Sequence, residues 1–364
     1  MSAANNPRGS TAVTRAGAVV GPYTVLRSRG SGGMGAVWEA RGPGGETVAL
    51  KLMHSHLADD DVLIKRFRRE YDVGSRIQHP NLVRMLATGD AHGAPYIVME
   101  LAAGKSLRKL IDKGSPYFHE WEAASVGAQV ADALAALHSN NVVHRDLKSS
   151  NIMVDRDLHA KVIDYGIARV TGERTISAGD NFMGTVEYSG PEPYFARPQG
   201  PESDIYSLGI VIYEMVTGRV PFRSDRYLDT LRMHAEKPPP RLSETMPMVS
   251  EQLDNLVYQM LQKRPDQRPT AVQVGAACRS VVDLIGRGPL SASPAWEMPS
   301  APSQNAAPLY RPPLAPPPGG DPSAAGWAQG APDAGNQKRI AVFLMLAAAG
   351  LALVGVVAAV AAGS

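Results

Sequence analysis

The sequence predicts an α+β chain in which a strand-rich part precedes a helical part. Residues 36–40 and 47–53 alternate between apolar and polar side chains on either side of a glycine-rich turn, which is the pattern of two paired strands. Residues 124–141 and 204–218 instead carry apolar side chains at helical spacing or all round, as core helices do. Residues 286–337 are rich in proline, alanine, serine and glycine, a composition that cannot bury a core.

The length of 364 residues is enough for a two-lobed domain with appendages. Lys and Arg number 37 against 35 Asp and Glu, so the net charge of +2 gives no reason to expect a nucleic-acid partner. The single cysteine, Cys278, excludes an intrachain disulfide and favours a reducing compartment. It lies in an apolar run and is expected in the core. The histidines show no spacing typical of metal ligands.

The chain divides into four parts. We expect a disordered polar tail over residues 1–22, a folded domain over 23–285, an extended spacer over 286–337 and a transmembrane helix over 338–362. The tail has no apolar run of signal-peptide length. Within the spacer, "RPPLAPPP" also suits an aromatic-lined peptide-binding module, but a plain spacer is the simpler interpretation.

The apolar stretch from Ile340 to Ala362 contains no charged residue. As a helix it would span about 35 Å, which exceeds the ~30 Å hydrocarbon core of a bilayer. It has no polar face, so a buried helix of a soluble domain is the weaker interpretation. Lys338 and Arg339 precede it, and the positive-inside rule then predicts a single-pass protein of the cell membrane with the folded domain in the cytoplasm.

A glycine-rich loop directly precedes the expected strand over residues 36–40. It contains Gly30, Ser31, Gly32, Gly33, Met34 and Gly35. The spacing G-x-G-x-x-G alone is weak evidence, because dinucleotide-binding folds share it. In those folds a helix follows the last glycine, whereas here a strand follows, so the loop is expected to cover phosphates as a flap. Lys51 ends the next strand and can reach such phosphates. Glu70, on a helix expected within residues 59–77, can pair with it.

Further motifs follow in order: "VVHRDLKSSNIMV" with Asp146, "KVIDYGIA" with Asp164, "GTVEYSGPE" ending at Glu192, a helix with Asp204, and "KRPDQRPT" with Arg268. In order and spacing they resemble the protein kinase family over residues 23–285. The resemblance implies a bilobal protein kinase fold, with a β-rich N-lobe and a helical C-lobe. It also implies ATP and Mg²⁺ as cofactors and protein substrates.

The resemblance assigns a role to each matching residue. Asp146 would orient the substrate hydroxyl and accept its proton, while Lys148 would reach the transferred phosphate. Asn151 and Asp164 would bind Mg²⁺. The ATP site would comprise the glycine-rich loop, the Lys51–Glu70 pair, backbone groups of Glu100 and Leu101, and an apolar ceiling of Val37 and Ala49. Glu192 and Arg268 would form a buried ion pair, and Asp204 would have a structural role.

The run Asp-Leu-Lys-x-x-Asn resembles serine/threonine kinases rather than tyrosine kinases. Thr175 or Ser177 is the expected autophosphorylation site, with Arg145 as the receptor of the phosphate; the weaker alternative is that both are solvated loop hydroxyls. Membrane tethering would favour phosphorylation in trans between neighbours, for which a homodimer is one arrangement.

The sequence departs from the family pattern at Arg29, Tyr165, Val186 and Gly190. An apolar residue usually stands at Arg29, so weaker adenine packing is expected there, and Gly190 is expected to add flexibility. None of the four changes removes a charged catalytic group, which argues against the alternative of a catalytically dead scaffold. The segment "GTVEYSGPE" argues against a second alternative, a small-molecule kinase.

Overall fold

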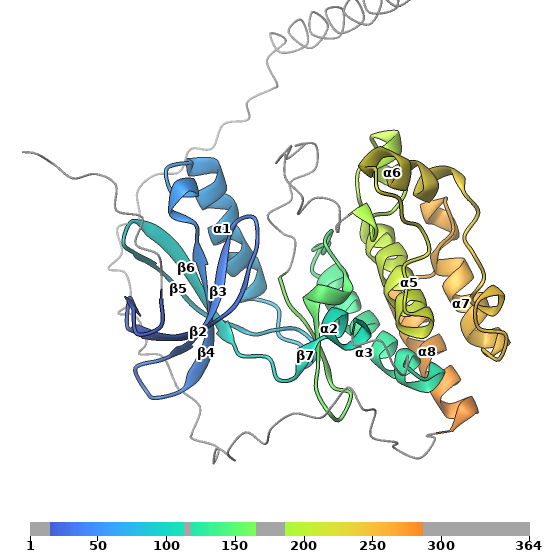
Figure 1. Cartoon of the computed structure of the whole chain (residues 1–364), viewed down its shortest axis with the longest axis horizontal. Helices are drawn as coiled ribbons and strands as arrows, with labels where there is room; N and C mark the ends of the chain where they lie inside the picture. The colour runs from blue at the N-terminus through green and yellow to red at the C-terminus, as the bar shows by residue number, and fades with distance from the viewer. Residues whose placement is uncertain (1–14, 113–117, 165–185, 287–364) are drawn as a thin grey trace, which may run out of the picture. The chain divides into compact units, whose positions relative to one another are not determined.

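The structure is a computed structural model that describes residues 15–112, 118–164 and 186–286. Its N-terminal lobe is a six-stranded antiparallel sheet in the order β1-β2-β3-β4-β6-β5 with one helix, α1 (Figure 1). The elements of this lobe are β1 (Val19–Val20), β2 (Tyr23–Ser31), β3 (Gly35–Arg41), β4 (Thr47–Met53), η1 (Ser55–Leu57), α1 (Asp61–Gly74), β5 (Met85–Ala91) and β6 (Ala94–Glu100). The two strands expected on either side of the "RGPGG" turn are confirmed.

The C-terminal lobe is mainly helical and carries a second, three-stranded sheet in the order β7-β8-β9. Its strands are β7 (Lys105–Ser106), β8 (Ile152–Val154) and β9 (Ala160–Val162). Its α-helices are α2 (Leu107–Ile111), α3 (Glu120–Ser139), α5 (Pro201–Thr217), α6 (Tyr227–Glu236), α7 (Glu251–Met260) and α8 (Ala271–Ile285). Its short 3₁₀ helices are η2 (Ser149–Asn151), η5 (Glu192–Phe195), η6 (Leu242–Glu244) and η7 (Pro265–Gln267). The α+β class and the two lobes are therefore as expected.

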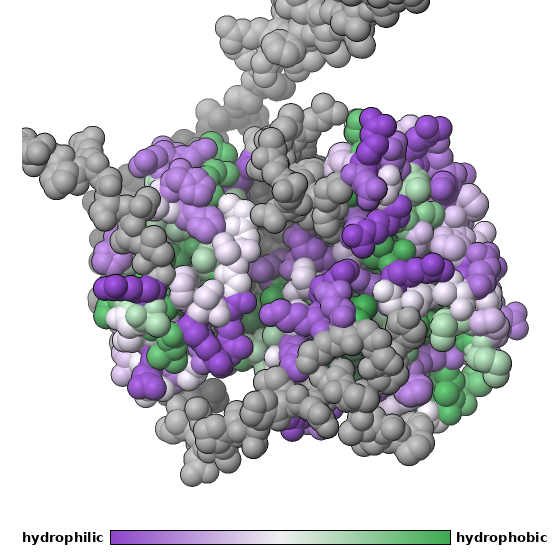
Figure 2. Space-filling model, viewed as in Figure 1, coloured by the Kyte–Doolittle hydropathy of each residue, from purple (hydrophilic) through white to green (hydrophobic). Residues whose placement is uncertain are grey.

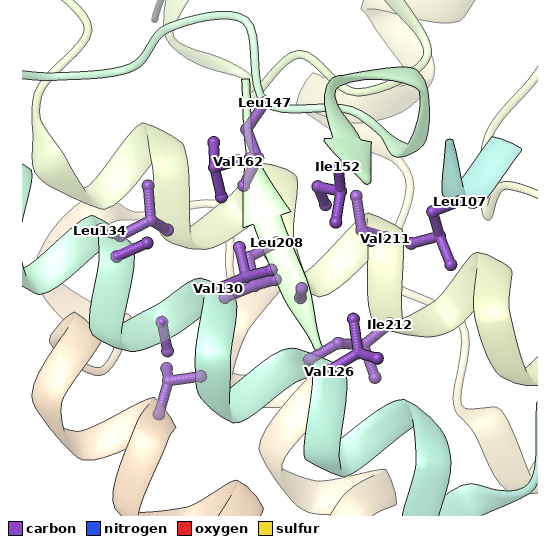
Figure 3. Close-up of a cluster of buried hydrophobic side chains, with 14 of the residues drawn as sticks. Leu107, Val126, Val130, Leu134, Leu147, Ile152, Val162, Leu208, Val211 and Ile212 are labelled. Carbon is purple, nitrogen blue, oxygen red and sulfur yellow. The ribbon is translucent and has the colours of Figure 1, made fainter. Parts of the chain in front are cut away.

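Helix α5 is buried along nearly its whole length, which explains its uniformly apolar sequence. It ends where Gly218 adopts a left-handed conformation, with φ of 73°. Figure 3 shows its side chains meeting those of α3 in one apolar cluster. Leu147, Ile152 and Val162 join this cluster from within the motifs that carry Asp146 and Asp164. The core therefore supports the backbone on which the expected catalytic residues lie.

The folded part begins earlier than the sequence suggested. Val19 and Val20 form β1 and pair antiparallel with Thr24 and Tyr23 of β2. Val20 is buried in the small core of the N-terminal lobe. The sheet therefore reaches into the range 1–22 expected to be a disordered tail, because Val19 and Val20 belong to it.

Cys278 is buried, as expected. Figure 2 shows hydrophilic residues over much of the described surface on the visible face, with hydrophobic residues in scattered patches. Within the described residues no helix is long and apolar enough to cross a membrane. The expected spacer over 286–337 and the expected span over 338–362 lie outside those residues, apart from Gly286, as do Tyr165, Thr175 and Ser177.

Candidate active site

Lys51 lies on β4, which pairs with β3 on one side and β6 on the other. It stands opposite Val37 of β3 and Ile97 of β6. Residues directly opposite in an antiparallel pair share one face, and residues two apart in a strand do too. Val37, Ala49 and Lys51 therefore lie on the same face of the sheet. This is the arrangement expected for an apolar ceiling beside a phosphate-binding cation.

Glu70 is brought to Lys51 by helix α1. The Asp60 side chain caps this helix, accepting hydrogen bonds from the amides of Val62 and Leu63 at 2.8 and 3.2 Å. Phe67 and Glu70 lie one turn apart on the buried face. The apolar anchor and the carboxylate therefore reach the sheet together, so that packing of Phe67 positions Glu70.

The ammonium group of Lys51 is shared by two carboxylates. Its Nζ donates to Glu70 Oε1 and Oε2 at 2.7 and 3.1 Å and to Asp164 Oδ1 at 2.9 Å. Burial alone would lower the pKa of Lys51, but the charges of Asp164 and Glu70 outweigh this effect and raise it. The pKa of Asp164 is lowered, because Lys51 outweighs the opposing effect of burial. Burial raises the pKa of Glu70 despite the opposing charge of Lys51. The expected pairing of Lys51 with Glu70 is confirmed, and the shifts at Lys51 and Asp164 favour their charged forms.

The loop that carries Asp146 is fixed by Asp204 in the first turn of α5. The Asp204 carboxylate accepts hydrogen bonds from the amides of His144 and Arg145, both at 2.8 Å, and lies 2.8 Å from His138 Nε2. Arg145 has a left-handed backbone with φ of 61°, a conformation that costs energy for a residue with a Cβ. The structural role expected for Asp204 is therefore to hold this loop in a strained shape.

Asp146, Lys148 and Asn151 form one hydrogen-bonded group. Lys148 Nζ donates to Asp146 Oδ2 at 3.0 Å, and Asn151 Nδ2 donates to the same oxygen at 3.3 Å and to the Asp146 carbonyl at 2.9 Å. The Asn151 amide nitrogen is thus occupied, which directs its carbonyl oxygen away from Asp146. That oxygen is a hard ligand of the type that Mg²⁺ prefers.

Asp164 follows β9 and is tied to this group through the backbone. The amide of Ile163 donates to the carbonyl of Asn151 at 2.9 Å. Asp164 itself has a left-handed backbone, with φ of 53°. The structure thus brings the two expected metal ligands onto adjacent segments. Around them, the carboxylates of Glu70, Asp146 and Asp164 outnumber the ammonium groups of Lys51 and Lys148. A further cation fits this imbalance of charge.

The glycines around the turn from β2 to β3 fall into two kinds. A Cβ on Gly35 would lie 2.3 Å from the carbonyl oxygen of Leu52, so this glycine is required by the close approach of β4. A Cβ on Gly30 or Gly33 would meet no atom within 4 Å, and neither residue has a positive φ. Nothing in the described protein therefore requires glycine at those two positions, and a closely approaching ligand such as a triphosphate explains them.

The segment after β6 corresponds to the expected adenine contact. The amide of Glu100 donates to the carbonyl of Arg84 at 2.9 Å, so that amide is not available to a base. The Glu100 carboxylate accepts from the Arg84 amide at 2.9 Å and from Lys161 Nζ at 2.6 Å. Of the backbone groups expected to meet adenine, only the Glu100 carbonyl and those of Leu101 remain.

Arg29 forms an ion pair with Glu39, which also accepts from Arg27 Nε at 2.7 Å. Glu39 lies opposite Ala49 and therefore on the same face of the sheet as Val37. An arginine–glutamate pair thus replaces an apolar contact at this edge of the site. The departure at Arg29 was visible in the sequence, whereas its ion pair with Glu39 was not predicted.

The expected pair of Glu192 and Arg268 is confirmed and almost fully buried. The Arg268 guanidinium donates to Glu192 Oε1 at 2.5 Å and to the carbonyls of Glu202 and Gln262 at 2.9 and 2.8 Å. A Cβ on Gly190 would lie 2.0 Å from Glu192 Oε2. This glycine therefore makes room for the buried carboxylate, a reason that differs from the flexibility expected for it.

A second polar network lies beside Asp146 and was not predicted. Tyr188 donates its hydroxyl to Glu214 Oε2 at 2.6 Å and lies 2.9 Å from Ser149 Oγ, while Arg108 Nη1 donates to Glu214 Oε1 at 2.9 Å. Burial raises the pKa of Tyr188, so the phenol keeps its proton. This network ties Tyr188, in the middle of the "GTVEYSGPE" motif, to the catalytic loop. Because its members are far apart in sequence, no local pattern points to it.

Comparison with known proteins agrees with this geometry. The family model described as "Protein kinase domain" matches residues 23–277. The serine/threonine-protein kinase PkaA of Streptomyces coelicolor is 36% identical over 279 residues, covering 72% of this chain and 50% of that protein. The serine/threonine-protein kinase PrkC of Bacillus subtilis is 34% identical over 267 residues, covering 73% of this chain and 41% of that protein. The chain thus spans about half the length, or less, of these relatives.

Among solved structures, the kinase domain of PknI from Mycobacterium tuberculosis is similar, with a TM-score of 0.58. The match covers 74% of this chain and 100% of that domain at 24% sequence identity, which supports the fold alone. The fold, the arrangement of charged residues and the relatives agree. The chain belongs to the protein kinase family, and its kinase domain is of the bacterial serine/threonine type.

Proposed function

We propose that this protein transfers the γ-phosphate of ATP to serine and threonine hydroxyls of protein substrates, with Mg²⁺ bound at Asn151 and Asp164. The observation that carries this proposal is the convergence of Lys51, Asp146 and Asp164 on one site, with Lys51 Nζ bonded to Asp164 at 2.9 Å. A scaffold protein without activity has no need to keep all three charges. The bound Mg²⁺ would neutralise phosphate charge during transfer.

Each residue of the site then has its own role in binding ATP or in phosphate transfer. Lys51, held by Glu70, binds phosphate oxygens, and the loop over residues 30–35 covers them. Asp146 orients the substrate hydroxyl and accepts its proton as the oxygen attacks phosphorus. Lys148, 3.0 Å from Asp146, stabilises the negative charge of the transferring group. Val37, Ala49 and the backbone after β6 hold the base.

Transfer of radiolabel from ATP tests the proposal. The purified full-length chain is incubated with Mg²⁺, labelled ATP and a generic basic protein, and the labelled amino acids are then identified. Label on phosphoserine and phosphothreonine is expected. No labelling of protein would favour the scaffold, and label only on small molecules would favour a small-molecule kinase.

We also propose autophosphorylation at Thr175 or Ser177. A cavity of about 400 Å³ between α1 and the segment before the catalytic loop is lined by Arg69, Arg76 and Arg145. Arginines bind phosphate through several charge-assisted hydrogen bonds, which suits this cavity to a phosphorylated side chain. Phosphopeptide mapping after incubation with Mg-ATP tests this idea. An active enzyme that carries no phosphate at either residue would exclude it.

The membrane part of the proposal rests on the sequence alone. Residues 338–362 would span the cell membrane once, and residues 286–337 would tether a cytoplasmic kinase domain near its surface. Tethering would raise the local concentration of neighbouring kinase domains and favour phosphorylation in trans. A chain truncated before Lys338 should lose membrane association and autophosphorylation in cells while keeping activity on an added peptide. Loss of the peptide activity as well would contradict a role limited to tethering.

A further inference from the structure

His54 makes two contacts with the glycine-rich loop. It follows β4 directly, three residues after Lys51. Its imidazole Nε2 lies 2.9 Å from the carbonyl oxygen of Gly32 and 3.5 Å from the hydroxyl of Ser31. Its backbone amide donates to the carbonyl of Met34 at 3.1 Å. One residue at the end of a central strand therefore holds two carbonyls of the loop.

The contact with Gly32 fixes the direction of the next amide. A carbonyl oxygen only accepts hydrogen bonds, so the Nε2 of His54 must carry the hydrogen. In a planar trans peptide the N–H points away from the preceding C=O. With the Gly32 carbonyl directed at His54, the N–H of Gly33 is directed to the opposite side. Within the described residues, neither Gly33 nor Met34 donates its amide to any group.

Gly30, Ser31 and Gly35 are held by strand pairing, so only residues 32–34 of the loop lie outside the strands. A Cβ at Gly30 or Gly33 would touch nothing within 4 Å, so side-chain packing cannot restrain these positions. Inside the loop, Gly32 N donates to Gly35 O at 2.9 Å. This hydrogen bond closes the turn but does not restrain the amides of Gly33 and Met34. A loop of this composition loses much conformational entropy on binding a ligand unless it is ordered beforehand.

We propose that His54 is a positioning residue that orders the glycine-rich loop and directs the Gly33 amide at the phosphates of the bound nucleotide. The inference rests on the proposed function, since it assumes that a nucleotide binds beneath the loop. It assigns separate tasks to β4 and to the residue that follows it: Lys51 supplies a cation for the phosphates, and His54 holds the loop that carries uncharged amide donors. His54 touches no nucleotide and acts only through the loop.

Nucleotide binding measured by calorimetry tests this inference without relying on catalysis. The full-length chain is titrated with ADP and, separately, with adenosine, which lacks the phosphates. His54→Ala should weaken ADP binding by about tenfold, the value of one hydrogen bond to a charged group. It should leave adenosine binding unchanged. His54→Gln should restore most of the ADP affinity, because its side-chain amide nitrogen can donate to the Gly32 carbonyl.

A matched control is available in the same lobe. His92 Nε2 lies 3.1 Å from the carbonyl oxygen of Val19, a contact of the same chemistry away from the loop. His92→Ala should leave the ADP and adenosine affinities unchanged. An unchanged ratio of ADP to adenosine affinity in His54→Ala, or an equal loss for both ligands, would overturn the inference while the proposed function stands. Failure of the wild-type chain to bind ADP would overturn both.

Discussion

Two buried ionic clusters of this protein contain similar groups but are built differently. Around Arg268, the guanidinium meets one carboxylate, Glu192, and backbone carbonyls complete its hydrogen bonds. Around Lys51, a single ammonium group meets two carboxylates, Glu70 and Asp164. The exposed fractions differ too: the Arg268 and Glu192 side chains are 0% and 3% exposed, whereas that of Asp164 is 34% exposed.

These features distinguish a cluster that stabilises the fold from one that serves chemistry. The Arg268 cluster is balanced in charge and closed to solvent, and all of its contacts lie within the C-terminal lobe. The Lys51 cluster joins three elements from both lobes, retains excess negative charge and remains open on the side of Asp164. A buried cluster with unbalanced charge is therefore the better guide to a ligand site.

Breaking the closed cluster should have the largest effect. Arg268→Met leaves Glu192 as an unpaired buried carboxylate and should lower the free energy of unfolding by about 3–5 kcal/mol. Urea denaturation of the purified chain measures this. Arg264→Met is the matched control, because the Arg264–Asp266 pair is exposed and its loss should cost less than about 0.5 kcal/mol. Equal losses in the two variants would erase the distinction between the clusters.

Removing a charge from the open site should affect the reaction rather than the fold. Asp146→Asn retains the shape of the side chain but cannot accept the substrate proton, so the rate of phosphate transfer should fall by at least ~10²-fold. Steady-state kinetics on an added peptide measures this rate. Asp157→Asn, in the exposed turn between β8 and β9, should leave it unchanged. A comparable fall in both variants, or lost stability in Asp146→Asn, would contradict the assignment.

Lys263 adds a second cation beside the closed cluster around Arg268. Its Nζ lies 3.4 Å from the Tyr206 hydroxyl and 4.5 Å from the centre of the Phe222 ring, and within the described residues it forms no ion pair. Burial and the nearby Arg268 lower the pKa of Lys263 to about 7. Lys263→Met should therefore stabilise the protein at pH 7 by about 2 kcal/mol, a figure that allows for partial solvent exposure.

The pH dependence of that gain follows from the direction of the shift. An unfolded lysine has a pKa near ~10.4, so between about pH 7 and 10 the unfolded chain binds a proton that the folded chain has released. Wild-type stability from this group rises with pH across that window, and the advantage of Lys263→Met shrinks. The nearby His234 has its pKa lowered to about 3 by burial and does not titrate there. Denaturation at pH 7 and pH 9.5 tests this, and a constant advantage would contradict it.

The sequence predicted the parts of the site that depend on short motifs. Asp146, Lys148 and Asn151 lie within six residues of one another, so local backbone geometry decides their arrangement. The Lys51–Glu70 pair was predictable because a strand end and a helical face fix where each side chain points.

What the sequence did not predict depends on contacts between distant segments. Tyr188 and Glu214 meet through tertiary packing, and nothing near either residue signals its partner. The two-residue strand β1 is too short to show any periodicity, so its pairing with β2 was missed. Residues 287–364 lie outside the described structure, and what was expected of them stays a prediction.

The hold of Asp204 on the catalytic loop has a consequence for how long that loop persists. The amides of His144 and Arg145 both end on one carboxylate that is anchored in the most deeply buried helix. Their hydrogens should therefore exchange with solvent deuterium only when the whole lobe unfolds, whereas that of Gly33 should exchange at once. In this protein the backbone of the catalytic loop is therefore as persistent as the core, whereas the glycine-rich loop is open to solvent exchange in the folded state.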